Sequence, residues 1–294
     1  MSHRALRSAL WSLVLSGLVI GCKSPNRATA PPSAAASDRD VVARLDLTPE
    51  RLAGLTEGTM SVETDPFYDE KRPTFGGYAF DEVMALIPGI ARIDRERHSL
   101  RFVCADGYRT VFPFEAVVGG KGLLATRLAN SPHADSPWRT IRRGKTEQTP
   151  APYYLVWADE TDLKKRPWPY QLVRIEVITN ASLESALAPP AEAKVDAGYE
   201  LFRTHCLACH SVNLQGGKMG PELNVPQNIL AYRDEARLMA FVKSPQSFRA
   251  GSLMPPQGLS DAKLKAVFAY LRAMAARKVC ATPAACAAHA AKGP

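Results

Sequence analysis

Long hydrophobic runs are scarce in this chain of 294 residues. The longest lies at residues 9–20, and it is too short to cross a bilayer comfortably. No second apolar run comes near the roughly 18 residues that suggest a membrane-spanning helix. Internal repeats are also lacking, which argues against a solenoid or propeller. The rest of the chain is therefore expected to lie outside the membrane, in ordinary globular domains.

The first residues have the pattern of an export signal. Arg4 and Arg7 form a short basic region before the apolar run, as in a secretory signal peptide. The run ends in Val19-Ile20-Gly21-Cys22, which resembles a bacterial lipobox. The resemblance implies a signal peptide at residues 1–21, lipid on the thiol of Cys22, and a periplasmic protein anchored to the inner or outer membrane. An uncleaved anchor, or an ordinary signal with an incidental cysteine, is the alternative.

The composition divides the mature chain into two domains. With 46% hydrophobic residues, the chain has enough apolar material for real cores. Residues 22–43 are rich in Pro, Ala and Ser and are predicted to form a flexible tether. A second such stretch at residues 183–193 is predicted to be a linker. It separates a domain at residues 44–182 from one at residues 194–278, followed by a tail at residues 279–294.

The short sequence HCLACH at residues 205–210 carries the strongest chemical signal. A structural zinc site needs four ligands, and no second Cys/His pair follows at finger spacing. A redox Cys-x-x-Cys pair is expected near a βαβ pattern, whereas this pair is followed directly by His210 and a Gly-rich loop. Cys206 and Cys209, followed directly by His210, have the spacing for covalent attachment of haem c. The sequence therefore predicts one haem, bound through two thioethers, with His210 as proximal iron ligand.

A second axial ligand is expected among the later methionines. Met239 and Met274 fall on apolar helical stripes and are predicted to lie in the core. Met219 follows His210 too closely to reach the other side of the iron. Met254 lies in a loop between Gly251 and a Pro-Pro pair, where irregular backbone can direct a thioether inward. Met254 is therefore the predicted sixth ligand.

Residues 191–278 resemble class I cytochrome c, the single-haem electron-transfer family. The first helix of that family is matched by DAGYELF, with Gly198 and Phe202 at the helix crossing. The segment KMGPELN is similar to the family's Gly-Pro loop, which implies that the carbonyl of Pro221 orients His210. The sequence LMPP matches the ligand loop, and the helix from Ser260 to about residue 277 carries Tyr270. The resemblance implies an all-α fold around a haem that exchanges single electrons.

The charge distribution bears on the partner. The formal net charge is +8, and from residue 191 onward there are 13 Lys and Arg against 7 Asp and Glu. Nucleic acid is not an expected target for an exported lipoprotein. The basic excess favours a redox partner protein with an acidic docking patch, although a merely solvated basic surface has the same composition.

Two further cysteines follow the last predicted helix. Cys280 and Cys286 have Pro283 between them and are near enough in sequence to close a small loop. In an oxidising compartment a disulfide is expected. Two free thiols on an Ala-rich tail are the alternative.

The first domain is predicted to be α+β with a mainly antiparallel sheet. Residues 100–104 and 108–112 alternate as strands around Asp106-Gly107, a hairpin signal. Further strands are predicted at residues 122–128, 153–158 and 170–178, and helices at residues 80–87 and 113–118. Trp157, Trp168 and Tyr170 are predicted to be packing or interface aromatics.

Part of this domain resembles the second half of the oxidoreductase molybdopterin-binding domain of the sulfite oxidase class. The resemblance is carried by FVCADGYRTVFPFEAVV, GLLATRLAN and YQLVRIEVI. In that family a cysteine in an earlier strand ligates molybdenum, and Cys104 does not match its position. Cys104 is therefore predicted to be a small core residue; a reactive thiol is the alternative.

Two functions follow from these patterns. The first is a membrane-anchored periplasmic cytochrome that carries single electrons and has no catalytic residue of its own. The second is a self-contained oxidoreductase whose first domain oxidises a substrate and passes electrons to the haem. The first is preferred, because the second needs a cofactor for which no ligand is visible in the sequence.

Overall fold

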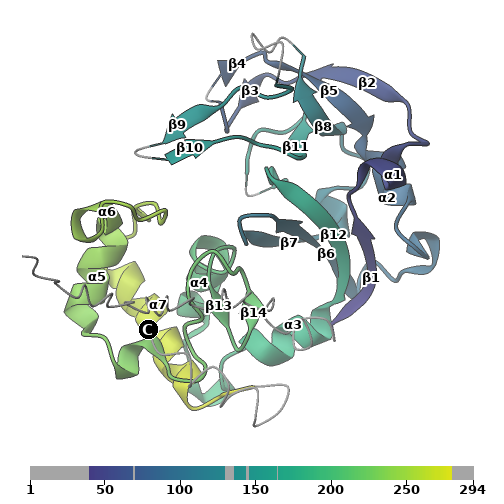
Figure 1. Cartoon of the computed structure of the whole chain (residues 1–294). Helices are drawn as coiled ribbons and strands as arrows, with labels where there is room; N and C mark the ends of the chain where they lie inside the picture. Colours follow the sequence, from purple (N-terminus) through teal and green to yellow (C-terminus); the bar gives the residue numbers. More distant parts are fainter. Residues whose placement is uncertain (1–39, 69, 130–135, 144–145, 164, 280–294) are drawn as a thin grey trace, which may run out of the picture. The chain divides into compact units, whose positions relative to one another are not determined.

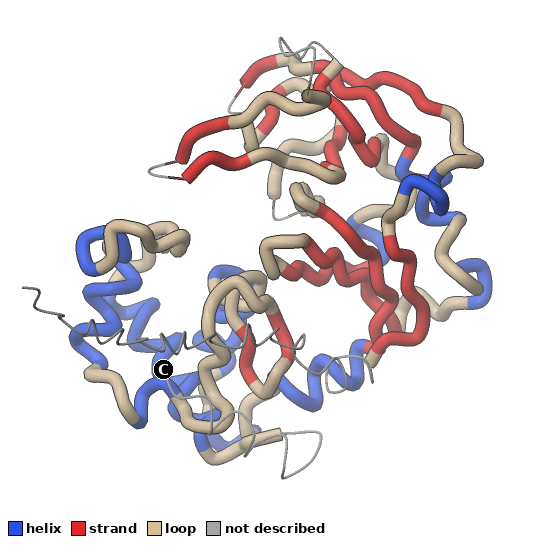
Figure 2. Tube along the Cα trace, viewed as in Figure 1, coloured by secondary structure: helices blue, strands red, loops and turns tan. Residues whose placement is uncertain are grey.

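A computed structural model describes residues 40–68, 70–129, 136–143, 146–163 and 165–279. Strands dominate up to residue 179 and helices dominate after it (Figures 1 and 2). All pairings between named strands in the described ranges are antiparallel. The predicted α+β region followed by an all-α region is confirmed. None of the described helices is long and apolar enough to cross a membrane.

Two four-stranded sheets form the first region. The first has the order β1-β12-β6-β7, so β7 is an edge strand. Its strands are β1 (Val41–Asp46), β12 (Leu172–Thr179), β6 (His98–Cys104) and β7 (Arg109–Pro113). The second has the order β11-β8-β5-β2. Its strands are β11 (Tyr154–Trp157), β8 (Gly122–Leu128), β5 (Thr74–Ala79) and β2 (Glu57–Ser61).

Short elements complete the structure. The two-stranded pairs are β3 (Thr64–Asp65) with β4 (Glu70–Lys71), β9 (Ile141–Arg143) with β10 (Thr146–Gln148), and β13 (Ser211–Val212) with β14 (Gln215–Gly216). The α-helices are α1 (Pro49–Leu52), α2 (Phe80–Ala85), α3 (Asn180–Leu187), α4 (Asp196–His205), α5 (Glu235–Lys243), α6 (Pro245–Phe248) and α7 (Asp261–Ala275). The 3-10 turns are η2 (Ile90–Arg92), η3 (Phe114–Ala116), η4 (Ala191–Ala193) and η5 (Ile229–Ala231).

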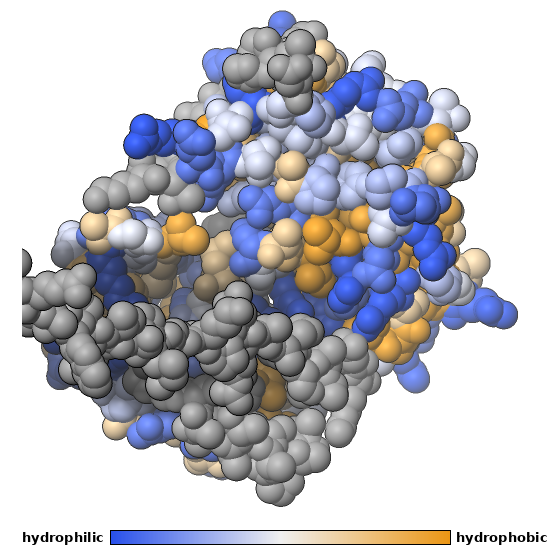
Figure 3. All heavy atoms as spheres, viewed as in Figure 1, coloured by the Kyte–Doolittle hydropathy of each residue, from blue (hydrophilic) through white to orange (hydrophobic). Residues whose placement is uncertain are grey.

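One hydrophobic core joins the two sheets. Phe102 and Ile175 of the first sheet and Phe75 and Tyr154 of the second are fully buried in it. Phe80 of α2 closes the same core. On the face of the molecule in Figure 3, hydrophilic residues are interspersed with smaller groups of hydrophobic ones.

The hairpin between β6 and β7 forms as its sequence predicts. Gly107 has a φ of +92°, which a residue with a side chain rarely adopts. The carboxylate of Asp106 accepts a hydrogen bond of 2.8 Å from the backbone N–H of Tyr108. These two residues therefore fix the turn, and Cys104 and Tyr108 end up paired across it.

A second core is built from the C-terminal helices. α4 and α7 cross at Gly198, where a Cβ atom would lie 2.0 Å from the carbonyl oxygen of Ala266. Tyr270 of α7 is fully buried beside Phe202 of α4, with ring centroids 5.2 Å apart. Ser260 caps α7 by accepting from the N–H of Lys263. The close crossing predicted for Gly198 is thus confirmed.

Three predicted segments differ in the structure. The tether predicted at residues 22–43 extends too far, because β1 begins at Val41 and Asp40 is buried in a salt bridge with Arg101. The linker predicted at residues 183–193 begins inside α3, where Leu183 and Leu187 are buried in the second core. Their burial in a shared core outweighs the Pro- and Ala-rich composition of the stretch. The helix predicted at residues 113–118 is only the single turn η3, because β7 continues to Pro113.

A buried ion network lies across the first sheet. The guanidinium of Arg101 donates to Glu176 on the neighbouring strand and to Asp40, each at 2.7 Å. All three side chains are at most 4% exposed. Removing one of these charged side chains would leave the others buried without a counter-charge and out of reach of water. The network is therefore stable only when all three are present.

We predict that Arg101→Ala lowers the free energy of unfolding by about 3–5 kcal/mol, because Asp40 and Glu176 would be left buried without a counter-charge. Arg97→Ala is the matched control, since the Arg97 side chain is 84% exposed in its salt bridge with Asp94. It should cost no more than about 0.5 kcal/mol. Urea denaturation followed by circular dichroism measures both. Equal stability of the two variants would refute a structural role for the network.

Candidate haem-binding site

The attachment sequence forms one tight turn at the end of α4. The N–H of Cys206 donates to Phe202 O at 2.9 Å, which continues the helix by one bond. The N–H groups of Cys209 and His210 both donate to Cys206 O, at 3.1 and 2.9 Å. Cys206 and Cys209 are free thiols and are half-buried. The turn therefore brings the two thiols and the imidazole onto one short, hydrogen-bonded segment.

The imidazole of His210 has a fixed orientation. Its Nδ1 lies 3.0 Å from the carbonyl oxygen of Pro221, as the resemblance to cytochrome c implies. A carbonyl only accepts, so Nδ1 carries the proton and Nε2 keeps its lone pair. Burial is the main cause that lowers the pKa of His210, which keeps the ring neutral at pH 7. A neutral ring with a free Nε2 is the form that binds a metal.

The loop after His210 approaches the imidazole so closely that residue 220 has no room for a side chain. A Cβ at Gly220 would lie 2.4 Å from Cε1 of His210. The N–H of Gly220 donates to Cys209 O at 2.8 Å, which holds the loop in this position. Glycine at residue 220 is thus required by the backbone's approach to the ring.

Polar residues that the sequence did not single out hold the same loop. The carboxylate of Glu222 accepts from the backbone N–H groups of Asn213, Leu214, Asn224 and Val225, at 2.9–3.2 Å. Because Glu222 follows Pro221 directly, these bonds also fix the carbonyl that orients His210. A carboxylate that caps the backbone of an irregular loop follows no periodic pattern, so Glu222 could not be recognised from the sequence.

Three buried asparagines connect this loop to α7. Asn228 donates to Leu271 O at 2.7 Å and to Asn224 Oδ1 at 2.8 Å. Asn224 in turn donates to Asn213 Oδ1 at 2.8 Å. All three are at most 4% exposed, so the chain of side-chain bonds satisfies polar groups that water does not reach.

The thiols are desolvated in the folded chain. Burial, followed by the charge of the neighbouring Cys209, raises the pKa of Cys206 to about 12. Burial, followed by the charge of Asp106, raises the pKa of Cys209 to about 11. Both therefore stay protonated at neutral pH and have the low polarity expected of positions that become thioethers.

Met274 and Met239 pack as predicted, whereas the ligand role of Met254 stays a prediction. Met274 is fully buried in α7, and Met239 packs against the second core. Met254 is half-buried in the irregular segment between α6 and α7. Its backbone is held, because its carbonyl oxygen accepts from Gln246 at 2.8 Å and its N–H donates to Ser252 at 3.3 Å. The thioether itself takes no part in these bonds.

These features fit a covalently held haem. Cys206 and Cys209 are unpaired and have the spacing for haem attachment. His210 is neutral with a free Nε2, and Gly220 lies beside its ring. Cys206 and Cys209 would hold the porphyrin through thioethers, and His210 would ligate its iron.

The hairpin of the first region contacts the attachment turn directly. The N–H of Arg109 donates to Ala208 O at 2.9 Å, and the N–H of Lys218 donates to Gly107 O at 2.8 Å. A Cβ at Gly107 would lie 3.0 Å from the backbone of Lys218 and Met219. The sequence predicted the hairpin but gave no indication that its tip packs beside Cys209.

Cys104 is a core residue, as predicted. It is 4% exposed and packs in the core between the sheets. Burial raises the pKa of its thiol well above the ordinary range. Within the described ranges, no group of three or more His, Cys, Asp and Glu side chains could hold a metal ion. Cys22, Cys280 and Cys286 lie outside the described residues.

We predict that Gly220→Ala lowers the stability of the haem-loaded protein by about 1–3 kcal/mol, the usual cost of forcing extra atoms into a packed site. The cause is the collision between the new Cβ and the His210 ring. Gly251→Ala is the control, because a Cβ there meets nothing within 4 Å. Thermal unfolding followed at the Soret band compares them. Identical midpoints for both variants would show that the loop does not constrain the imidazole.

Comparison with known proteins agrees with this geometry. Residues 195–275 match the family model Cytochrome c, a range that contains the attachment turn, the Pro221 loop and Met254. No curated protein matches the chain. The resemblances to a lipoprotein signal and to a molybdopterin-binding domain stay sequence-based predictions. The C-terminal region of this chain is a cytochrome c domain, which implies covalently bound haem c and a haem-based electron carrier.

Proposed function

We propose that the chain is an exported electron carrier with a single haem c, ligated by His210 and Met254 and anchored to a membrane by lipid on Cys22. The observation that carries the proposal is the His210–Pro221 hydrogen bond beside the two free cysteines. It is supported by the cytochrome c match over residues 195–275.

A bound haem supplies one-electron exchange between ferric and ferrous iron, and a thioether ligand raises its potential relative to a second imidazole. The residues of this chain do the positioning. Pro221 holds the proton of His210 at Nδ1 and thereby keeps Nε2 available as a ligand. Gln246 and Ser252 hold the backbone of Met254, which leaves its side chain free to serve as the second ligand. A second protein ligand would leave no open position on the iron, which favours electron transfer over chemistry there.

The proposed partner is a redox protein with an acidic surface. Arg237, Arg249 and Lys263 are exposed on the cytochrome c domain. Among the residues that the structure describes, none of the three side chains is in a salt bridge, whereas the neighbouring Lys243 pairs with Asp261. Unpaired surface cations of this kind attract acidic patches and accelerate encounter.

We predict that Met254→Leu abolishes the weak near-infrared band of ferric His/Met haem, lowers the midpoint potential and opens the iron to carbon monoxide. Leucine fills a similar volume but has no donor sulfur. Met219→Leu and Met239→Leu are the controls and should keep the band. Near-infrared absorption and a potentiometric titration provide the measurements. Loss of the band in Met219→Leu with retention in Met254→Leu would transfer the ligand role to the Gly-rich loop.

We predict that Cys22→Ser releases the protein from membranes or blocks its processing, because a serine cannot take a thioether-linked lipid. Membrane and soluble fractions are compared by immunoblot, with Cys104→Ser as the control for loss of an unrelated thiol. Processing to the wild-type size together with retention on membranes in high salt would contradict lipid anchoring through Cys22.

A further inference from the structure

A cavity of about 620 Å³ lies beside the edge strand β7. Its walls come from two regions of the chain. Residues 108–113 and 167–170 line it from the sheet region, and Arg203, Leu207 and Ala208 line it from the cytochrome c domain. The volume is within the range of small-molecule sites. The hydrogen bond between Arg109 and Ala208 ties the two walls together.

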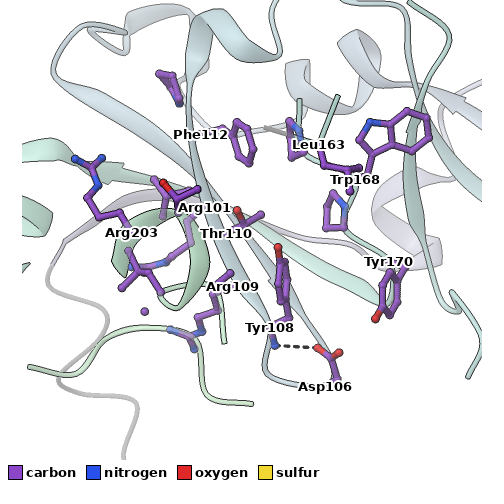
Figure 4. A pocket seen from close by; sticks show the side chains of 18 of the residues that line it. Arg101, Asp106, Tyr108, Arg109, Thr110, Phe112, Leu163, Trp168, Tyr170 and Arg203 are labelled. Carbon is purple, nitrogen blue, oxygen red and sulfur yellow. Dashed lines mark hydrogen bonds between the residues drawn. The ribbon is translucent and has the colours of Figure 1, made fainter. Parts of the chain in front are cut away.

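One wall is aromatic and already packed. The rings of Phe67 and Tyr170 have centroids 4.8 Å apart, and those of Tyr154 and Trp168 are 6.2 Å apart. Tyr154 is fully buried, and its hydroxyl donates to Asp65 at 2.9 Å. Figure 4 shows Tyr108, Phe112 and Trp168 around the same space. A preformed wall of this kind favours a planar apolar ring.

Two hydrogen-bond donors on the cavity wall have no acceptor. Trp168 is 8% exposed, and its Nε1 is buried without a partner. The Nε of Arg109 is also buried without a hydrogen-bond acceptor. Trp157, by contrast, donates its Nε1 to Pro167 O at 2.6 Å. A buried donor without an acceptor is costly, and both residues line the cavity.

The charge around Arg109 also favours an anion. Burial, followed by the charge of Arg101, lowers the pKa of Arg109. The nearby carboxylates of Asp40 and Glu176 are engaged by Arg101. Within the described ranges Arg109 itself is in no salt bridge, and Figure 4 shows its side chain leaving β7 in a different direction from Tyr108. Arg109 is therefore a partly desolvated cation that makes no salt bridge of its own in the described ranges, while Glu176 and Asp40 act on it at longer range.

The acidic groups on the wall are already engaged. Asp106 accepts from the N–H of Tyr108 at 2.8 Å, and burial raises the pKa of its carboxyl. Glu200 lies 3.6 Å from Arg203, which also lies 3.5 Å from Glu184. Neither carboxylate neutralises Arg109.

We propose that this cavity binds a small organic anion that carries an aromatic ring, with its acidic group toward Arg109 and its ring against Trp168 and Tyr170, which are less buried than Tyr154. Leu207 and Ala208 belong to the wall. A bound ligand would therefore contact the turn between Cys206 and Cys209. The sheet region would then be a ligand-binding module attached to the electron carrier. The proposal goes beyond electron transfer and does not depend on it.

Isothermal titration calorimetry of the full haem-loaded chain tests this, with 2-naphthoate as the probe. Saturable binding at one site is expected. Acetate, which lacks the ring, and 2-naphthalenemethanol, which lacks the charge, should each bind at least about tenfold more weakly. Because calorimetry does not read the haem, failure here leaves the electron-carrier proposal intact.

Variants assign the binding to the cavity. Arg109→Gln should weaken 2-naphthoate about tenfold, and Trp168→Phe, which keeps a ring but removes the N–H, several-fold. Arg142→Gln, an exposed arginine on β9, is the control and should change nothing. Circular dichroism confirms that each variant is folded. No saturable binding at millimolar probe, equal affinity for acetate, or equal losses in Arg109→Gln and Arg142→Gln would each overturn the proposal.

Discussion

The cytochrome c domain depends on the hydrogen bond between the imidazole of His210 and the carbonyl of Pro221. This bond sets the tautomer of the ring and leaves Nε2 as the nitrogen for a metal. It exists only because the loop passes beside the ring without a side chain at Gly220, and because Glu222 ties the following turn to four backbone N–H groups. Backbone contacts around His210 therefore fix the orientation of its imidazole.

The same turn is where the two regions of the chain meet. Gly107 and Arg109 form backbone hydrogen bonds with Lys218 and Ala208, so the tip of the β6–β7 hairpin rests on the segment that carries the thiols. A shared second core, to which Ile178 of β12 and Leu187 of α3 both contribute, adds a hydrophobic contact. This arrangement gives the sheet region a physical means to influence the haem environment, by way of the attachment turn.

Local chemistry explains what the sequence could predict. The Asp106-Gly107 turn needs a positive φ and an Asx bond, and both are encoded in two adjacent residues. The strand at residues 122–128 and the helix capped by Ser260 likewise follow from short patterns. The attachment spacing is equally local, since the turn from Cys206 to His210 closes on its own hydrogen bonds.

The features that the sequence did not reveal depend on partners distant in the chain. Arg101 is buried only because Asp40 and Glu176 arrive from other strands. The side chain of Asn228 donates to the carbonyl of Leu271, which is distant in the sequence. The stretch around Leu187 is helical because Leu187 packs in the second core, whose other residues come from distant segments. The cavity beside β7 is formed by residues from both regions, so the unpartnered donors of Arg109 and Trp168 become visible only in three dimensions.

The central claim is that Cys206, Cys209 and His210 hold one covalently bound haem. The pyridine haemochrome spectrum of the full-length protein, combined with iron quantification, tests this most directly. The account predicts a c-type spectrum, with both vinyl groups saturated, and one iron per chain that acidified organic solvent does not extract. A b-type spectrum with extractable haem, or a chain that matures normally without iron, would contradict it.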